Sequence, residues 1–409
     1  MVGMREANNL VWNTFGCRCG AFFLAMYVFF AHLNYPFSQT LLLYMGVVFS
    51  SILLLSGFKI PKSKVVNLYI VILIITAVGC TYSNNITLAT RQFIFFSIYG
   101  IILWLAVKNN QFVQISKKLM YIFSLIGMAS VYIQFLIPGL SNIVIKKLFR
   151  AKTYENIIWS YNVDGSYTGL TPSVSMASFS MAIVFFVSAD KVIKYFFQTD
   201  NENENNHVNY SAIMLMFFSL LGIVLTNKRG IFLAVILAFV LSCFLDKDIS
   251  IKKLTNNRFL LLCAAGIALI IVGIFLLSRN EQITHFALRF QNNSKSLLTG
   301  REEYYTRAVE EYSSGNIFTI LFGKGTASAY YISRTGVHNV YLQILYDHGI
   351  IGLIIYLIFF ISNLRYAIKN KYYYSMSLQI VFLAYCMSGN PLYDYFFFIP
   401  YLLNTQYKG

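Results

Sequence analysis

Charged residues are scarce in this chain of 409 residues: Asp, Glu, Lys and Arg together make up 12% of it, with 16 acidic residues against 32 Lys and Arg. So little charge, beside 57% hydrophobic and 17% aromatic residues, excludes an ordinary soluble domain and predicts a polytopic membrane protein. The formal net charge of +16 is first interpreted as a sign of membrane topology, and we expect no nucleic acid partner.

Cysteine and proline are also rare. The six cysteines lie in or beside apolar segments and lack the spacing of metal ligands, which predicts free thiols and no disulfide framework. The six prolines all lie at or near the ends of apolar segments, where they do not break a helix. No small-residue cleavage site follows the first apolar segment, so we expect a retained helix there.

Long apolar runs predict the fold. Each needs about 17 to 25 residues to cross the hydrocarbon core. About 12 such segments are expected in a single all-α membrane domain over residues 1–409, near 16–33, 38–57, 65–82, 88–107, 119–138, 172–189, 210–226, 230–246, 259–277, 342–364, 373–389 and 391–404. The last is short and is also compatible with a re-entrant piece.

Lys and Arg fall in alternate connections, which by the positive-inside rule makes both termini cytoplasmic. Loops 139–171, 227–229 and 278–341 then face outward, and the last is a large loop in which we expect short amphipathic helices. No paired-carboxylate or Asp-x-Asp metal constellation appears on these loops, where the main acids are Asp164, Glu281 and those between Glu302 and Glu311, so no metal and no cofactor is expected. The turn at 323–325 lacks the spacing and the Lys-Ser/Thr ending of a P-loop, which excludes that nucleotide site.

The stretch 299–352 interrupts the apolar pattern with polar residues. Thr299 and Glu302 fit a capping box, which predicts a helix that starts near Gly300 and in which Glu303 and Arg307 can pair. A cation at Arg301, in the first turn, opposes the helix dipole unless an anion binds there. Free amides and a guanidinium together form a phosphate or diphosphate site.

His338 begins a second helix within this stretch, at the membrane surface. The helix dipole lowers the pKa of an imidazole at such a position and keeps it neutral, as a general base requires. Arg229 lies in a very short turn between two membrane segments, which favours a ligand role. The outward loops carry further cations, among them Arg279 and Arg289, and lipid phosphates or a diphosphate substrate are the two partners considered.

The ordered motifs resemble the carboxy-terminal signature of the O-antigen polymerase and O-antigen ligase family. They are Thr299-Gly300-Arg301, then Gly-x-Gly, then His338-Asn339-x-Tyr-Leu-x-x-Leu, an acidic residue and Gly-Ile-Ile-Gly, with residues 167–172 and 225–230 upstream. In the second upstream piece Lys228 stands where the family usually has Ser, which leaves the arginine in place. The resemblance covers residues 167–356.

This resemblance implies an integral membrane glycosyltransferase of the bacterial inner membrane, with its site on the periplasmic face. It implies a metal-independent, inverting transfer on a fold similar to GT-C type membrane glycosyltransferases. The expected partners are an undecaprenyl-diphosphate-linked oligosaccharide donor and acceptor, membrane lipids and a chain-length regulator protein.

The candidate roles follow from these two lines of reasoning. His338 is the candidate catalytic base. The candidate substrate and diphosphate ligands are Arg229, Arg279, Arg289, Arg301, Asn339 and Tyr167, the last of which is equally suited to stack on a sugar or to anchor the chain at the interface. Asp347 occupies the acidic position of the motif, where it orients either a helix or a neighbouring arginine.

Three functions remain open. A polymerase moves the growing chain onto the non-reducing-end sugar of a lipid-linked repeat unit, and a ligase moves the finished chain onto the lipid A core. The polymerase is preferred because abundant Ile, Asn, Lys, Phe and Tyr indicate an AT-rich gene, and antigen gene clusters are often AT-rich. A lipid-linked oligosaccharide flippase is less favoured, since it should show internal repeats.

Overall fold

The computed structural model describes residues 2–31, 33, 45–46, 63–197, 210–245, 301–333 and 336–404. Within these ranges the chain is all-helical, and an isolated bridge between Leu33 and Phe149 is the one β contact. The elements are α1 (Val2–Phe30), α3 (Lys64–Thr81), α4 (Ile86–Lys108), α5 (Asn110–Leu136), α6 (Pro138–Leu148), α7 (Ala151–Asp164), α8 (Val174–Phe197), α9 (Tyr210–Leu225), α10 (Arg229–Leu245), α14 (Glu302–Ser313), α15 (Ile317–Phe322), η1 (Ser328–Tyr331), α16 (Val340–Lys369), α17 (Tyr373–Tyr385), η2 (Pro391–Tyr393) and α18 (Tyr395–Leu403).

Five described helices are long and apolar enough to cross a membrane: α3, α4, α5, α8 over Val174–Ile193, and α16. Part of α1, α9 and part of α10 are shorter apolar helices. The predicted all-α, multi-pass class is therefore confirmed. The predicted segments 38–57 and 259–277 lie outside the described residues, so the number of about 12 spans stays a prediction.

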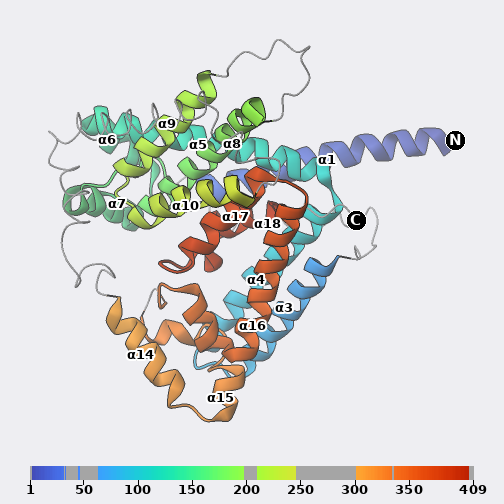
Figure 1. The fold of residues 1–409 in the computed structure, drawn as a ribbon, viewed down its shortest axis with the longest axis vertical. Helices are drawn as coiled ribbons and strands as arrows, with labels where there is room; N and C mark the ends of the chain where they lie inside the picture. Colours follow the sequence, from blue (N-terminus) through green and yellow to red (C-terminus); the bar gives the residue numbers. More distant parts are fainter. Residues whose placement is uncertain are drawn as a thin grey trace.

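The helices pack in two groups that share one core. Helix α3 lies beside α4 and α16, whereas α5 lies beside α8 and α9, and α10 lies beside α17. The first turns of α1 lie toward one side of the bundle, and α7 and α14 lie toward the other (Figure 1). The predicted loop 139–171 contains α6 and α7, and the described part of the predicted loop 278–341 contains α14 and α15.

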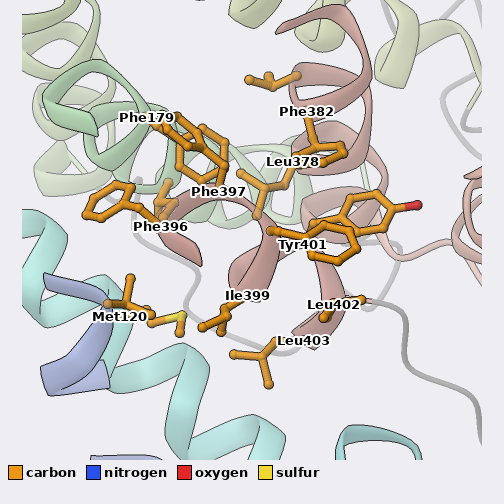
Figure 2. Packing of buried hydrophobic residues seen from close by; sticks show 14 of the residues in the cluster. Met120, Phe179, Leu378, Phe382, Phe396, Phe397, Ile399, Tyr401, Leu402 and Leu403 are labelled. Carbon is orange, nitrogen blue, oxygen red and sulfur yellow. The ribbon is translucent and has the colours of Figure 1, made fainter. Parts of the chain in front are cut away.

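Helix α18 fills the centre of the bundle. It is nine residues long and apolar on every side, so its length of about 14 Å cannot cross a hydrocarbon core of about 30 Å. Phe397 packs on Phe179 with ring centroids 4.9 Å apart, and Tyr401 packs on Phe382 at 4.5 Å (Figure 2). A helix with apolar residues all round is a core element, which explains why the last apolar segment is so short.

The segment after α15 docks onto the end of α3. The Thr326 amide donates to the Gly79 carbonyl over 3.1 Å, and the Thr326 hydroxyl donates to the Thr76 carbonyl over 2.7 Å. The Ser83 hydroxyl donates in turn to the Thr326 carbonyl over 2.6 Å. The turn at residues 323–325, which lacks the features of a nucleotide loop, thus leads into a segment that is tied to the end of α3, more than 240 residues away in the sequence.

Helices α15 and α16 touch backbone to backbone. Gly349 has a φ of 65°, and a Cβ at this position would lie 2.4 Å from the Leu321 carbonyl oxygen. Gly323 has a φ of 80°, and a Cβ there would lie 2.4 Å from the Asp347 carbonyl oxygen. Only glycine combines this left-handed conformation with so close an approach. The two glycines therefore determine how closely α15 packs on α16.

Asp347 completes this joint. Its side chain is fully buried, and Oδ1 accepts a hydrogen bond from the Ala329 amide over 2.7 Å. The carboxylate therefore orders the loop around η1. The sequence offered two roles for Asp347, to orient a helix or to orient an arginine. This contact fits the first, because Ala329 belongs to the short helix η1.

Replacing Gly349 with Ala should destabilise the fold. The new methyl group meets the Leu321 backbone, and the left-handed conformation alone costs about 1 to 3 kcal/mol for a residue other than glycine. Thermal unfolding in detergent measures the effect. Gly139→Ala in α6 is the control, because nothing lies within 4 Å of its Cβ position. Equal melting temperatures for the two variants would contradict the contact.

Candidate functional site

His338 lies in the loop that leads into α16. It has a φ of 58°, which is uncommon for a residue other than glycine, and its side chain is half-buried. The Tyr305 hydroxyl, on α14, donates to the His338 carbonyl over 3.3 Å. Backbone strain of this kind persists only where the surroundings hold it, and it concentrates at functional sites.

Asn339 is the N-cap of α16. Its Oδ1 accepts a hydrogen bond from the Leu342 amide over 3.1 Å, and the Val340 amide donates to the Cys386 carbonyl over 2.8 Å. A capping side chain of this kind satisfies an amide that the helix leaves without a partner. Asn339 therefore holds His338 at the start of the helix, and a contact to substrate stays a prediction for it.

Arg301 is the N-cap residue of α14, which begins at Glu302. The predicted helix start near Gly300 agrees to within two residues, and Thr299 lies outside the described residues. The Arg301 guanidinium donates through Nη1 to the Ser388 carbonyl. This contact brings the predicted anion ligand of α14 to the turn between α17 and α18.

The turn between α9 and α10 adjoins the same place. Arg229 is the first residue of α10 and is half-buried. A Cβ on the next residue, Gly230, would lie 3.1 Å from Ser388 Oγ. The Thr226 hydroxyl is 2.6 Å from the Ser178 hydroxyl of α8, which holds the turn against that helix. Three sequence-distant segments therefore meet at Ser388.

Tyr167 is close to this turn through its backbone and not through its ring. Its amide donates to the Leu225 carbonyl over 3.1 Å. The ring is 3% exposed and packs edge-on against Phe135 and Tyr161, with centroids 5.4 and 5.6 Å away. The contacts show a core residue beside the α9–α10 turn, and its sugar-stacking role stays a prediction. Arg279 and Arg289 lie outside the described residues.

The turn from Cys386 to Asn390 was missed from the sequence. It accepts hydrogen bonds from the Arg301 side chain and the Val340 amide, and it touches Gly230. Its only sequence signal is the run Ser388-Gly389-Asn390-Pro391 between two apolar segments. Because this run holds no charge, charge patterning does not single it out.

An acidic residue further along α14 is engaged away from these cations. Glu311 accepts hydrogen bonds from the Tyr346 hydroxyl (2.6 Å), Arg307 (2.8 Å) and Lys324 (3.3 Å). These partners, first the Tyr346 hydroxyl and then Arg307, lower the pKa of Glu311 to about 2. Arg307 thus pairs with Glu311, one turn further along, rather than with Glu303 as predicted. Glu311 therefore joins α14 to Tyr346 of α16 and to Lys324 in the turn after α15.

Burial and positive charge determine the protonation of His338. Burial is the larger cause, and the charges of Arg301 and Lys228 add to it, so the pKa of His338 falls to about 4. The imidazole is therefore neutral at physiological pH, and the causes are burial and these two charges, whereas the sequence prediction rested on the helix dipole. Lys228, the residue that departs from the family pattern, contributes to this field.

The arrangement suits two chemical tasks. Guanidinium and ammonium groups bind diphosphate oxygens and stabilise charge that develops on them. A neutral imidazole can take a proton from a hydroxyl group. In the described part of the chain no three His, Cys, Asp or Glu side chains gather as metal ligands would.

The fold and this site define a class: an all-helical, multi-pass membrane protein with a histidine flanked by cations. Residues 214–357 match the family model described as O-Antigen ligase. This match confirms the resemblance over that part of the chain to the O-antigen polymerase and ligase family, whose members are membrane glycosyltransferases that act on lipid-linked glycans. The matched range contains Arg229, Arg301 and His338, whereas Ser388 lies beyond it. No curated protein matches the chain.

The low pKa of His338 can be measured without any activity. Diethylpyrocarbonate modifies the neutral imidazole, and mass spectrometry of the His338 peptide against pH should give a midpoint well below the ordinary value of about 6.5. Arg301→Gln should raise that midpoint, because it removes a positive charge from the histidine's surroundings. The control Arg365→Gln changes an exposed cation near the other end of α16. A midpoint that stays unchanged in Arg301→Gln would contradict the electrostatic account.

Proposed function

We propose that this protein is an O-antigen polymerase. It transfers a glycan chain from a polyprenyl diphosphate onto the non-reducing-end sugar of a lipid-linked repeat unit, at the periplasmic face of the bacterial inner membrane. The observation that carries this proposal is the neutral histidine, His338, in the field of Arg301 and Lys228. The family match supports the class of reaction.

In the proposed step His338 takes the proton of the acceptor hydroxyl. The hydroxyl oxygen then forms a bond to the anomeric carbon of the donor, and the bond from that carbon to the diphosphate oxygen breaks. The electron pair leaves with the diphosphate, whose growing charge Arg301, Lys228 and Arg229 stabilise. Attack opposite to the leaving group inverts the anomeric configuration, and the step uses no metal.

The donor itself would tune the base. A pKa of about 4 makes His338 a weak base when the site holds only cations. A bound diphosphate neutralises those cations, and nearby negative charge favours the protonated imidazole. The pKa of His338 therefore rises toward the operating pH when the donor is bound, which is the condition for efficient general base catalysis.

A ligase that transfers the finished glycan to the lipid A core is the second candidate. The description of the matched family, O-Antigen ligase, favours it. The same base and cations serve both reactions, because the donors share the polyprenyl diphosphate and only the acceptor differs. The composition of the chain remains the reason for placing the polymerase first, with a chain-length regulator as its expected partner.

Deletion and complementation in the source bacterium test both candidates. Surface lipopolysaccharide is separated on a gel. A core with one repeat unit identifies a polymerase, and bare core with lipid-linked polymer behind it identifies a ligase. Complementation with His338→Ala should lower long-chain product by about 10²- to 10⁴-fold at an unchanged membrane level, whereas Arg365→Ala should restore it. Long polymer made by His338→Ala at wild-type levels would remove the assigned base.

A further inference from the structure

Tyr305 on α14 lies between the candidate base and the candidate anion ligand. Its hydroxyl donates to the His338 carbonyl over 3.3 Å, and the Arg301 side chain forms a hydrogen bond with the same phenol. A phenol can both donate and accept, whereas a guanidinium can only donate. Burial raises the pKa of Tyr305 and so preserves the proton that it donates. One oxygen atom, on Tyr305, therefore links Arg301 to His338.

The start of α14 explains why the two side chains meet. The Tyr305 amide donates to the Arg301 carbonyl over 3.0 Å, which is the hydrogen bond of a first helical turn. Residues four positions apart lie on the same face of a helix, one above the other. Since α14 packs against α16, this face carries both residues toward the segment from which α16 begins.

The backbone at His338 needs support from its surroundings. Its left-handed conformation, with a φ of 58°, persists only where neighbouring groups hold it. After His338 the chain is fixed to α17 and the turn that follows it, because the Val340 amide donates to the Cys386 carbonyl. From α14 the Tyr305 hydroxyl reaches the His338 carbonyl. The backbone at this residue directs the imidazole, so the Tyr305 contact bears on the geometry of the base.

The same contact bears on the direction of the guanidinium. Arg301 donates to the Ser388 carbonyl and also binds Tyr305. A guanidinium carries five N–H donors in one rigid plane, so donors remain for a diphosphate oxygen. Because the plane is held from two sides, the direction of these remaining donors is fixed.

Two other tyrosines of α14 provide a comparison. The rings of Tyr304, Tyr305 and Tyr312 all pack against one small apolar cluster, which includes Val337 next to His338. The Tyr312 hydroxyl donates to the Ile320 carbonyl over 2.6 Å and so joins α14 to α15. Within the described residues the Tyr304 hydroxyl makes no hydrogen bond. Of the three hydroxyl groups, that of Tyr305 is the one that reaches the His338 loop.

We propose that Tyr305 is a positioning residue for the glycosyl transfer, which holds the His338 backbone in a fixed place relative to the Arg301 guanidinium. This inference rests on the proposed function, because it adds a residue to the same site. Tyr305 acts through the base and the anion ligand and touches neither substrate. Its contact of 3.3 Å is long for a hydroxyl donor. Donor binding at Arg301 shortens it, as happens to catalytic hydrogen bonds when a free enzyme takes up its substrate.

The first test needs no activity. Tyr305→Phe keeps the ring and removes one oxygen atom, and hydrogen–deuterium exchange of the purified full chain in detergent is followed by mass spectrometry. Amides of residues 336–340 should exchange about 5- to 10-fold faster than in the wild type, which is the loss of one neutral hydrogen bond. Tyr304→Phe should leave this exchange unchanged. Tyr312→Phe should speed exchange in α15 instead.

The second test measures transfer from the lipid-linked donor by the same variants. Tyr305→Phe should lower kcat about 10-fold at an unchanged KM for the donor, whereas Tyr304→Phe and Tyr312→Phe should turn over as the wild type does. The double variant Arg301→Gln, Tyr305→Phe should lose little more than Arg301→Gln alone, because the link is already broken.

The two tests separate this inference from the function on which it rests. A Tyr305→Phe variant whose 336–340 amides exchange at the wild-type rate, or whose kcat equals that of Tyr304→Phe, would overturn the inference. A melting temperature of Tyr305→Phe far below that of Tyr312→Phe would also overturn it, since the hydroxyl would then support the fold as a whole. If the wild type transfers no glycan, the proposed function fails, and the exchange rates still decide whether Tyr305 holds His338.

Discussion

The backbone contact between α15 and α16 is the constraint on which the arrangement of residues 301–348 depends. Gly323 and Gly349 let the two helices meet without side chains between them, and the buried Asp347 carboxylate holds the adjoining loop through the Ala329 amide. Thr326 then fixes that loop to α3. Because α16 is anchored in this way, His338, two residues before the first residue of that helix, has a defined position relative to the membrane helices.

Charge is divided unevenly around that histidine. Arg301 and Lys228 lower its pKa, while the acidic Glu311 is held by Tyr346, Arg307 and Lys324 further along α14. The two cations therefore act on His338, while Glu311 is engaged with partners of its own. In the proposed reaction the field of these cations attracts the donor diphosphate, and the neutral imidazole takes the proton of the acceptor hydroxyl.

Much of the fold could be predicted from apolar runs, because a lipid-facing helix must be long and apolar. Helix α16 and helix α3 are examples. Helix α18 could be recognised only as unusually short, since a helix buried in protein and one exposed to lipid have the same composition. Within the site, Arg301 and His338 were predictable from charge and from a helix start. The Ser388 turn was not, because its backbone carbonyl, and no distinctive side chain, receives Arg301. The ring of Tyr167 could not be assigned to the core, since an aromatic residue beside a loop suits either environment.

The central claim is that the α9–α10 turn and the Ser388 turn, far apart in the sequence, meet at one site. A Cβ on Gly230 would lie 4.0 Å from the Ser388 Cβ, which is within the range of a disulfide. The most direct measurement is oxidative cross-linking of a Gly230→Cys, Ser388→Cys double variant in membranes, read by mass spectrometry of the joined peptides. The account predicts a disulfide between positions 230 and 388 and none for a Gly139→Cys, Ser388→Cys control. Free thiols at both positions after oxidation, in a protein at its normal membrane level, would contradict it.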